Sequence, residues 1–306
     1  MTLPEDIIIL SNEASESLAR RIALQLDIPF TRVLKKFFTD GEVYHAFPQD
    51  IAGKHIVIIG ATHDDVSLQE LIDLIDGCRY YRAKRVNVIV PYLGYSTMEQ
   101  AKPDSNEIPK GITRTRQIFL ARPDFVAFID LHSEAVLHAH RGDVQTQHIT
   151  TSKLIVQKIK ELQLENLVLV SPDYGRSKWV ARLAGQLNVP HTAADKDRYA
   201  MDKTMVSQVA SVVKGKTAVI CDDMIRTGGS IIQTALRCRE AGARETIIFA
   251  THLVLAGQSR EKFKEHGITR IIGADTYPGV ESDDLLDLFS VAPLVADVLK
   301  GHLRLS

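Results

Sequence analysis

The chain has 306 residues, 45% of them hydrophobic, which is enough to bury a sizeable core and to form two domains of usual size. Its 37 basic and 38 acidic side chains give a formal net charge of −1, which argues against a nucleic-acid groove or a membrane surface, since both need a basic excess. Three widely spaced cysteines and the lack of a basic apolar leader or a long apolar run predict a cytoplasmic protein without disulfides or a zinc site.

Short apolar runs rich in Val and Ile alternate along the chain with longer amphipathic stretches. The runs are typical of strands buried in a parallel sheet, and they cover residues 7–10, 55–60, 86–92, 125–131, 167–173, 217–223, 246–252 and 270–275. Helix-like stretches cover residues 15–26, 67–83, 177–187 and 230–243. Ser67 and Glu70 are expected to form a capping box. The repeated alternation predicts an α/β fold.

The two halves of the chain share a plan in which a buried strand leads into a glycine turn. It occurs in RAKRVNVIVPYLGYS (82–96) and again in KGKTAVICDDMIRTGGS (214–230). We therefore expect two similar domains in tandem, residues 1–148 and 149–306, with the last helix free to pack back on the first domain. Two polar, irregular segments, residues 98–111 and 194–203, are the candidates for active-site covers.

The strongest chemical signal is AVICDDMIRTGGSIIQTA (218–235), in which a buried strand runs into two carboxylates, a short turn and a helix. Glycines let the backbone curl until successive N–H groups point at one anion, and the helix N-terminus adds its positive end. We expect the turn to span residues 227–230 and to hold one phosphate monoester. Asp222 and Asp223 suit vicinal ribose hydroxyls or a hydrated Mg²⁺. The competing interpretation is a solvated turn with a chance pair of aspartates.

This string resembles the phosphoribosyl pyrophosphate motif of type I phosphoribosyltransferases and of ribose-phosphate diphosphokinases. The rest of the chain is more similar to the second group, and to its divergent, class-II-like members. The matching segments, in the same order as in that family, are FFTDGE (37–42), VIVPYLGYS (88–96), FIDLHSE (128–134), VSPDYGR (170–176), DKDR (195–198), ATH (250–252) and FSVAP (289–293). The resemblance implies two tandem type I phosphoribosyltransferase-like domains, each a mostly parallel sheet flanked by helices.

The resemblance also implies a role for each matching residue. Phe38 stacks on the nucleotide base, while Asp40 and Glu42 hold its ribose. His132 lies beside the transferred group and its Mg²⁺, and Asp173 is a second carboxylate linked to the metal. The two loop cations expected to act in catalysis are Lys196 and Arg198. Asp222 and Asp223 bind the sugar hydroxyls, and the residues expected to bind the 5-phosphate are Arg226, Thr227, Gly228, Gly229 and Ser230.

Each of these residues also has an interpretation without function. His132 alone is an ordinary histidine at a strand end, Asp173 a helix cap and Phe38 a core residue. Lys196 and Arg198 alone are solvated loop charges. Three further histidines follow the DLH strand at a spacing that fits no metal-ligand set, so we expect surface positions for His138, His140 and His148.

The chain departs from the common family pattern at three places. Thr97 and Met98 stand where an Arg-Gln pair usually contacts the nucleotide, which removes charge and hydrogen-bond donors from the donor site. Asp197 stands between the two loop cations, where a third cation is usual. Arg226 replaces an aspartate beside the phosphate turn, which suits tighter 5-phosphate binding or a larger, more anionic sugar.

The resemblance therefore implies Mg²⁺-dependent transfer of a diphosphoryl group from ATP to the C1 hydroxyl of ribose 5-phosphate, by a homo-oligomeric enzyme. Three alternatives stay open. One is the same chemistry on a larger acceptor such as ADP-ribose. Another is a catalytically silent subunit that associates with a synthetase, and the third is a nucleobase phosphoribosyltransferase.

Overall fold

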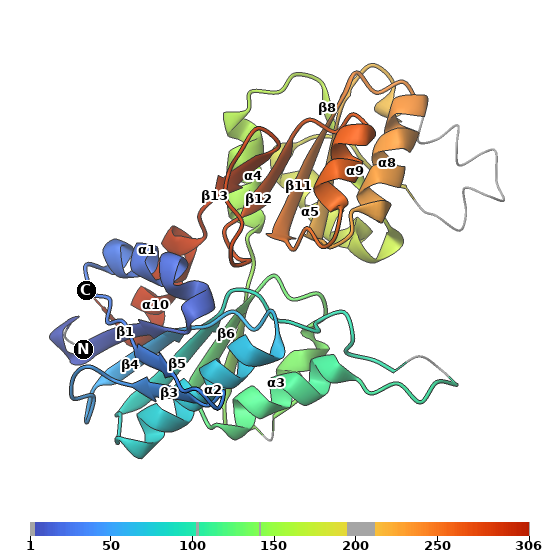
Figure 1. Cartoon of the computed structure of the whole chain (residues 1–306). Coiled ribbons are helices and arrows are strands. Elements are labelled where there is room, and N and C mark those ends of the chain that lie inside the picture. Colours follow the sequence, from blue (N-terminus) through green and yellow to red (C-terminus); the bar gives the residue numbers. More distant parts are fainter. Residues whose placement is uncertain (1–3, 102–103, 141, 195–211, 306) are drawn as a thin grey trace. The chain divides into compact units, whose positions relative to one another are not determined.

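The computed structural model describes residues 4–101, 104–140, 142–194 and 212–305 (Figure 1). The chain forms two compact units. Unit 1 joins Met1–Thr150 with Thr276–Gly279 and Ser290–Ser306, and unit 2 joins Thr151–Asp275 with Val280–Phe289. The first passage between the units, after Thr150, lies close to the expected boundary at residue 148, and the last helix belongs to unit 1.

Unit 1 is built on a five-stranded parallel sheet in the order β1-β4-β5-β6-β7. Its strands are β1 (Ile7–Ser11), β4 (His55–Ile59), β5 (Arg85–Val90), β6 (Phe125–Ile129) and β7 (Gln145–Ile149). Its α-helices are α1 (Glu16–Leu26), α2 (Asp65–Tyr80), α3 (Lys110–Leu120) and α10 (Ala292–Leu303), with 3-10 turns η1 (Pro4–Asp6), η2 (Glu13–Ser15) and η3 (Glu134–His138). An antiparallel hairpin, β2 (Leu34–Phe37) and β3 (Val43–Ala46), stands apart from this sheet.

Unit 2 contains a six-stranded parallel sheet in the order β13-β12-β11-β10-β8-β9. Its strands are β8 (Leu167–Ser171), β9 (His191–Ala193), β10 (Thr217–Ile225), β11 (Glu245–Leu253), β12 (Ile271–Ala274) and β13 (Leu286–Phe289). Its described helices are α4 (Ser152–Glu161), α5 (Tyr174–Leu187), α8 (Gly229–Glu240) and α9 (Ser259–Glu265). Two sheets of parallel strands with helices beside them confirm the predicted α/β class.

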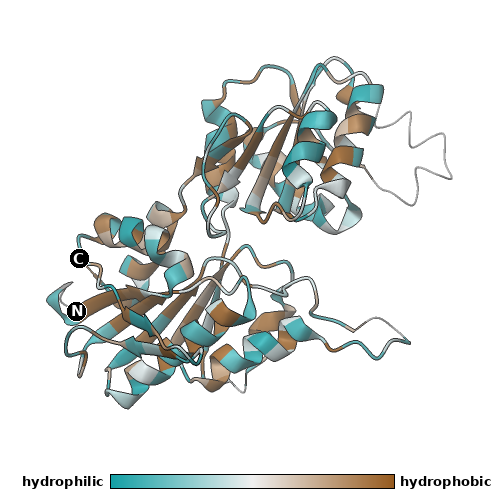
Figure 2. Ribbon diagram, in the orientation of Figure 1, coloured by the Kyte–Doolittle hydropathy of each residue, from teal (hydrophilic) through white to brown (hydrophobic). Residues whose placement is uncertain are grey.

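The eight predicted apolar runs all form strands, because each is covered on both faces and needs no polar alternation. Figure 2 shows these strands as brown ribbons between helices with teal outer faces. The three cysteines Cys78, Cys221 and Cys238 are free and buried in the cores. Burial raises the pKa of the Cys78 thiol to about 12, so it stays protonated at neutral pH.

Some elements differ from the sequence expectation. The capping box of α2 is formed by Asp64 and Ser67, not by Ser67 and Glu70, so the helix begins at Asp65. The Asp64 carboxylate accepts from the backbone N–H of Ser67 at 2.7 Å, while Glu70 lies one turn further on and is buried. The strands missing from the prediction are β2, β3, β7, β9 and β13, each of three to five residues and partly polar.

Within the described part of the chain, none of the helices combines the length and the apolar character that a membrane span requires.

Candidate functional site

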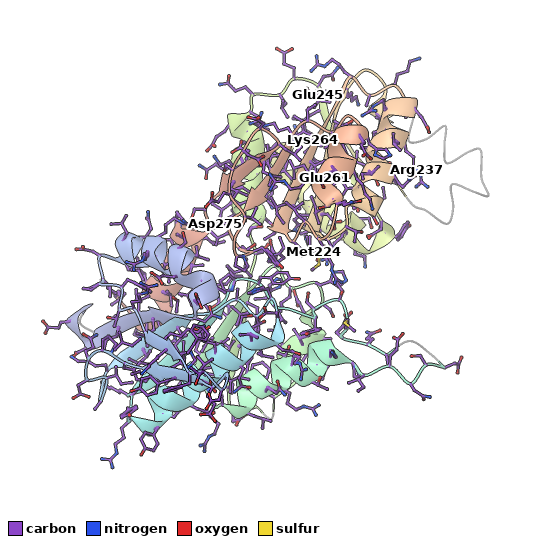
Figure 3. The ribbon with its side chains drawn as sticks, in the orientation of Figure 1. Met224, Arg237, Glu245, Glu261, Lys264 and Asp275 are labelled. Carbon is purple, nitrogen blue, oxygen red and sulfur yellow. The ribbon has the colours of Figure 1, made fainter. Side chains whose placement is uncertain are left out.

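The site in unit 2 begins at the carboxyl-terminal edge of its sheet. From β8 the chain continues to the outer strand β9, whereas from β10 it continues in the other direction to β11 and β12, so the strand order reverses between β8 and β10. Ligands of open α/β sheets bind at such reversals, beyond the strand ends. In Figure 3, Met224 and Asp275 mark this edge, and Glu245 marks the opposite edge.

β10 extends beyond its neighbour and carries the two carboxylates past the end of β8. Its ladder with β8 ends at the pair Ile220–Val170, but the strand itself runs to Ile225, two residues further than the sequence indicated. Asp222 and Asp223 therefore lie on a strand segment that β8 no longer borders. Both are buried, with exposed fractions of 9% and 5%. Buried carboxylates at a strand end need a partner, either a protein cation or a ligand.

The turn after β10 is shorter than expected, since it spans residues 226–228 and α8 begins at Gly229. Gly229 and Ser230, predicted as turn residues, are thus the first two residues of the helix. Gly228 has a φ of 78°, and a Cβ there would lie 2.4 Å from the Phe263 ring, so only glycine fits. As N-cap it offers no side-chain acceptor to the N–H groups of the first turn. Those groups suit an anion.

Asp173 and Arg176 reach the same edge from the start of α5. Asp173 is the N-cap, and its Oδ1 accepts the backbone N–H of Arg176 at 3.0 Å. The Arg176 side chain forms an ion pair with the Asp223 carboxylate. Asp173 therefore fills the capping role that the sequence left as an alternative, and its expected link to a metal stays a prediction. Arg176 lies in the quoted segment VSPDYGR, yet nothing in its local pattern indicated this partner.

Charge at this edge is concentrated on the three aspartates. Burial, followed by the charge of Asp223, raises the pKa of Asp222 well above its ordinary value of 3.8, and Asp173 adds to the effect. The backbone N–H of Asp223 donates to Asp222 Oδ1 at 2.9 Å. The raised pKa favours a protonated Asp222, which offers a hydrogen-bond donor beside the acceptor oxygens of Asp223 and so suits a pair of sugar hydroxyls.

In unit 1, the residues expected to bind the nucleotide lie at the tip of the β2–β3 hairpin. Phe38 N–H donates to Glu42 O at 2.9 Å, and the Asp40 carboxylate accepts from Glu42 N–H at 3.1 Å. Phe38 is 44% exposed and is therefore not a core residue. The Lys36 ammonium lies 5.1 Å from the centre of its ring. An exposed aromatic ring with two carboxylates nearby is able to stack on a base and accept from ribose hydroxyls.

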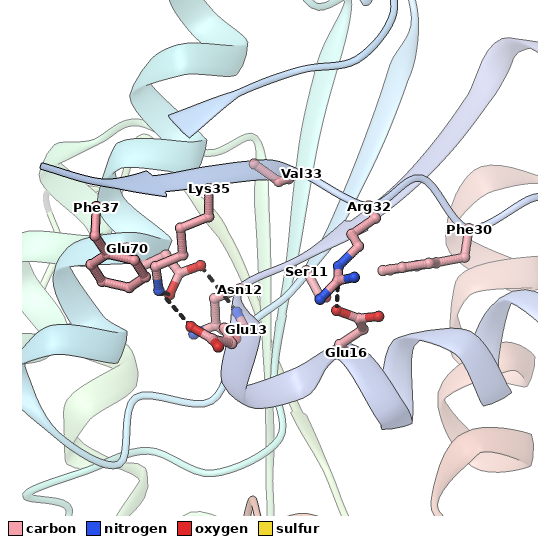
Figure 4. Close-up of a pocket in the computed structure, with 10 residues that line it drawn as sticks. All are labelled: Ser11, Asn12, Glu13, Glu16, Phe30, Arg32, Val33, Lys35, Phe37 and Glu70. Atoms are coloured by element: carbon pink, nitrogen blue, oxygen red, sulfur yellow. Dashed lines mark hydrogen bonds and ion pairs between the residues drawn. The ribbon is translucent and has the colours of Figure 1, made fainter. Parts of the chain in front are cut away.

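The root of the hairpin borders a polar pocket of about 170 Å³ (Figure 4). Lys35 lies between two glutamates, with its Nζ 2.7 Å from Glu13 Oε2 and 3.0 Å from Glu70 Oε2. Figure 4 shows Arg32 and Glu16 as a second ion pair, near Phe30. The pairs link the hairpin to α2 and to the start of α1. No local sequence pattern indicates this pocket, because its charged residues come from three separate segments of the chain.

His132 follows β6 on a short segment that a second histidine holds. The backbone N–H of Leu131 donates to His148 Nε2 at 3.0 Å, and the other ring nitrogen of His148 lies 2.8 Å from Glu134 Oε1. The side chain of His148 is 24% exposed. His148 is thus half-buried, and its two contacts hold the segment that carries His132. Sequence patterns did not reveal it because β7 was not recognised as the neighbour of β6.

Thr97 and Met98, which differ from the Arg-Gln pair of the common family pattern, follow the turn after β5. A Cβ at Gly94 would lie 2.0 Å from the carbonyl oxygen of Thr62, so the turn needs glycine. Met98 is 41% exposed, and its backbone N–H donates to Tyr95 O at 2.8 Å. The Lys110 ammonium on α3 lies 5.1 Å from the centre of the Tyr95 ring. A cation from α3 is thus present beside the turn at which the family resemblance leads us to expect an arginine.

The expected loop cations Lys196 and Arg198, with Asp197 between them, lie outside the described residues. Their roles stay predictions.

Known families and proteins match the chain over most of its length. Residues 7–111 match the family described as the N-terminal domain of ribose phosphate pyrophosphokinase, and residues 144–280 match the phosphoribosyl transferase domain. The chain is 32% identical to the ribose-phosphate pyrophosphokinase of Gloeobacter violaceus, over 96% of this chain and 90% of the relative. It is 27% identical to that of Ralstonia nicotianae, over 98% and 96%. The crystal structure of phosphoribosylpyrophosphate synthetase from Mycobacterium smegmatis is similar, with 28% identity, a TM-score of 0.86 and coverage of 98% and 99%.

Proposed function

Because the chain belongs to the ribose-phosphate pyrophosphokinase family, we propose that it transfers the diphosphoryl group of ATP to the C1 hydroxyl of ribose 5-phosphate. The products are phosphoribosyl pyrophosphate and AMP. In this step the C1 oxygen bonds to the β-phosphorus, the bond from that phosphorus to the α-phosphate oxygen breaks, and the hydroxyl proton leaves.

One observation carries the proposal: two buried carboxyls and an uncapped helix N-terminus meet where the strand order of unit 2 reverses. Asp222 and Asp223 suit the sugar hydroxyls, and the N–H groups at the start of α8 suit the 5-phosphate. Arg226 and Thr227, both exposed in the turn, are proposed to add a cation and a hydroxyl on that phosphate. The site thus selects a phosphorylated sugar with free vicinal hydroxyls.

The hairpin tip and the segment after β6 supply the nucleotide half in this proposal. Phe38 stacks on the base, and Asp40 and Glu42 accept from its ribose. His132, held in place by His148, contacts the transferred group and takes the proton or donates a hydrogen bond to phosphate. Diphosphoryl transfer needs in-line positioning and charge neutralisation more than covalent chemistry, and placed side chains of this kind provide both.

We further propose Mg²⁺ as the metal; when bound together with ATP, it would supply neutralisation of the charge that develops during transfer. The donor set fits this use. Among the described residues there is no group of three or more His, Cys, Asp and Glu side chains arranged to hold a metal. Mg²⁺ is commonly bound by one or two carboxylates together with substrate phosphates and water. His132 and Asp173 are the side chains proposed to reach it.

The experiment that tests the function is product identification with purified protein, ATP, Mg²⁺ and either ribose 5-phosphate or ADP-ribose. We expect AMP and phosphoribosyl pyrophosphate from the first sugar, detected by mass spectrometry. His132→Asn should lower kcat by about 10²–10⁴-fold with little change in KM for the sugar, as for loss of a general acid or base. His138→Asn, an exposed neighbour on η3, is the control. Absence of AMP with both sugars would refute the proposal.

The proposal also covers the cellular location and the oligomeric state of the protein. The protein acts in the cytoplasm, where its unpaired cysteines stay reduced, and it forms a homo-oligomer. Cell fractionation and analytical ultracentrifugation of the purified chain test these two statements separately.

A further inference from the structure

A half-buried arginine lies beside the carboxylates of unit 2. Arg176 is the third residue of α5, and its guanidinium forms an ion pair with Asp223. The side chains are 18% and 7% exposed, so water screens the pair weakly. The Arg176 backbone N–H at the same time donates to Asp173, which fixes the start of the helix. Arg176 therefore contacts two aspartates of the cluster, Asp173 through its backbone N–H and Asp223 through its side chain.

Arg176 changes the charge that the cluster presents to a ligand. Asp222 and Asp223 are neighbours at the end of β10, and Asp173 at the start of α5 is near enough for its charge to act on Asp222. Because the Asp223 carboxylate is paired with Arg176, the cluster carries less net negative charge than its carboxyls alone would give. The charge of the ligands is one of the factors that set the affinity of an oxygen site for divalent cations, so the paired cluster attracts them less than an unpaired one would.

We propose that Arg176 is a built-in cation that takes the place of a divalent metal ion at Asp223, so that the sugar-phosphate half of the site is complete without metal. A guanidinium is a fixed, planar donor set that holds a carboxylate in one orientation. Through Asp223, Arg176 positions the acceptor for the sugar hydroxyls. The part that concerns the sugar rests on the proposed function, and the part that concerns the metal does not.

A purely structural role for the pair predicts different behaviour. If the pair only clips α5 to β10 and Asp223 is closed off from ions in solution, breaking it would affect stability but would not change the affinity of the cluster for divalent ions. The two roles are therefore separated by metal binding, measured without nucleotide. Mn²⁺ serves as the probe, because its electron paramagnetic resonance signal distinguishes free from bound ion.

The first arm compares the wild-type protein with Arg176→Gln, Arg176→Lys and the control Arg182→Gln, which removes a cation from the same helix. We expect Arg176→Gln to gain one Mn²⁺ per chain with a Kd roughly tenfold or more below any wild-type binding, since the Asp223 carboxylate loses the charge of the guanidinium. Arg176→Lys keeps the charge and should bind Mn²⁺ as the wild type does. Arg182→Gln should also be unchanged.

The second arm uses thermal stability, and it works even if Arg176→Gln is weakly folded. Removing one partner of a buried pair is strongly destabilising, and a ligand that binds only the folded form restores stability. Mn²⁺ should therefore raise the Tm of Arg176→Gln more than that of the wild type or of Arg182→Gln. Equal Mn²⁺ affinity and equal Tm shifts in all four proteins would overturn the proposal and leave only the structural role.

The third arm measures ribose 5-phosphate binding by calorimetry in EDTA and in excess Mg²⁺. The wild type should bind the sugar phosphate equally well in both, whereas Arg176→Gln should need Mg²⁺. Wild-type binding that is lost in EDTA would overturn the inference. If the sugar phosphate does not bind under any condition and no AMP is formed, the proposed function fails instead, while the Mn²⁺ arm still decides the role of Arg176.

Discussion

Asp222 and Asp223 are neighbours in β10, yet they differ in their contacts and in the protonation state that their environment favours. Asp223 forms an ion pair with Arg176, whereas burial and the neighbouring charge favour the proton-bearing form of Asp222. The sequence presents the two only as a pair of identical acidic residues. This difference arises because the guanidinium of Arg176, which lies in α5 and 47 positions away in the sequence, pairs with Asp223.

Asp222→Asn tests this difference through the pH dependence of stability. The pKa of Asp222 is higher in the folded protein than its ordinary 3.8, so the folded state holds a proton that the unfolded state releases. Its contribution is fully present below about pH 4 and is lost as the pH rises towards the folded pKa, at up to about 1.4 kcal/mol per pH unit. The asparagine variant lacks this loss and should gain stability relative to the wild type as the pH rises.

Urea unfolding in EDTA buffers between pH 4.5 and 7.5 measures the two curves. Parallel curves for the wild type and Asp222→Asn would show that Asp222 is ionised in the folded protein, and would contradict the expectation.

At the scale of elements, the turn from β10 into α8 depends on a single glycine. Gly228 has a positive φ and lies against the Phe263 ring, whereas Gly229 has open space around its Cα. The sequence shows two adjacent glycines and predicts their joint use in a turn. The structure gives only the first of them a backbone conformation that other residues rarely adopt.

Gly228→Ala and Gly229→Ala form a matched pair. The first should cost about 1–3 kcal/mol for the left-handed backbone alone, with the collision against Phe263 in addition. The second is expected to be neutral or to stabilise by up to about 1 kcal/mol, since alanine restricts the unfolded chain. Urea unfolding measures both. Equal stability of the two variants would contradict the distinction.

The hairpin is the second element whose place depends on one side chain. Lys35→Met removes the cation between Glu13 and Glu70 and should cost about 1.5–3 kcal/mol, the usual range for hydrogen bonds to charged groups. Because the tip carries Phe38, we also expect a higher KM for ATP. Lys36→Met, the exposed neighbour, should leave stability almost unchanged. A Lys35→Met protein with wild-type unfolding and KM would rule out an anchoring role.

At the scale of the whole molecule, the chain passes between its two units more than once, and α10 returns to unit 1 from the end of the sequence. Val295 and Leu299 of this helix are completely buried, and α10 packs on α1. His302 adds a ring stacked on Phe125 and a polar contact of 3.0 Å to Asn87 Oδ1. Unit 1 is therefore not a continuous segment of the sequence.

Deleting residues 291–306 tests whether unit 1 needs α10 to stay folded. Each large apolar side chain that loses its cover forfeits about 1.5–3 kcal/mol, so the loss approaches the whole stability of a domain. We expect unit 1 to be digested rapidly in limited proteolysis while unit 2 persists. Lys300→Ala, on the exposed face of the same helix, is the control and should resist digestion like the wild type. Resistance of the truncated chain would show that α10 is dispensable.

The sequence by itself determined the α/β class, the eight apolar buried strands and the order of the motifs. Hydrophobic runs and glycine turns are local signals, and neighbours along the chain set them. It also identified Asp222, Asp223 and the phosphate turn as candidates, although the strand ends at Ile225 and the helix begins at Gly229.

Only the tertiary structure decided which residues meet. The short, partly polar strands β7 and β9 gain their hydrogen bonds from neighbours in the sheet, so their own sequences carry a weak pattern. The ion pair of Arg176 with Asp223, the support of His132 by His148 and the return of α10 join residues that lie far apart in the sequence. Such contacts depend on strand order and burial, which no local pattern of residue types contains.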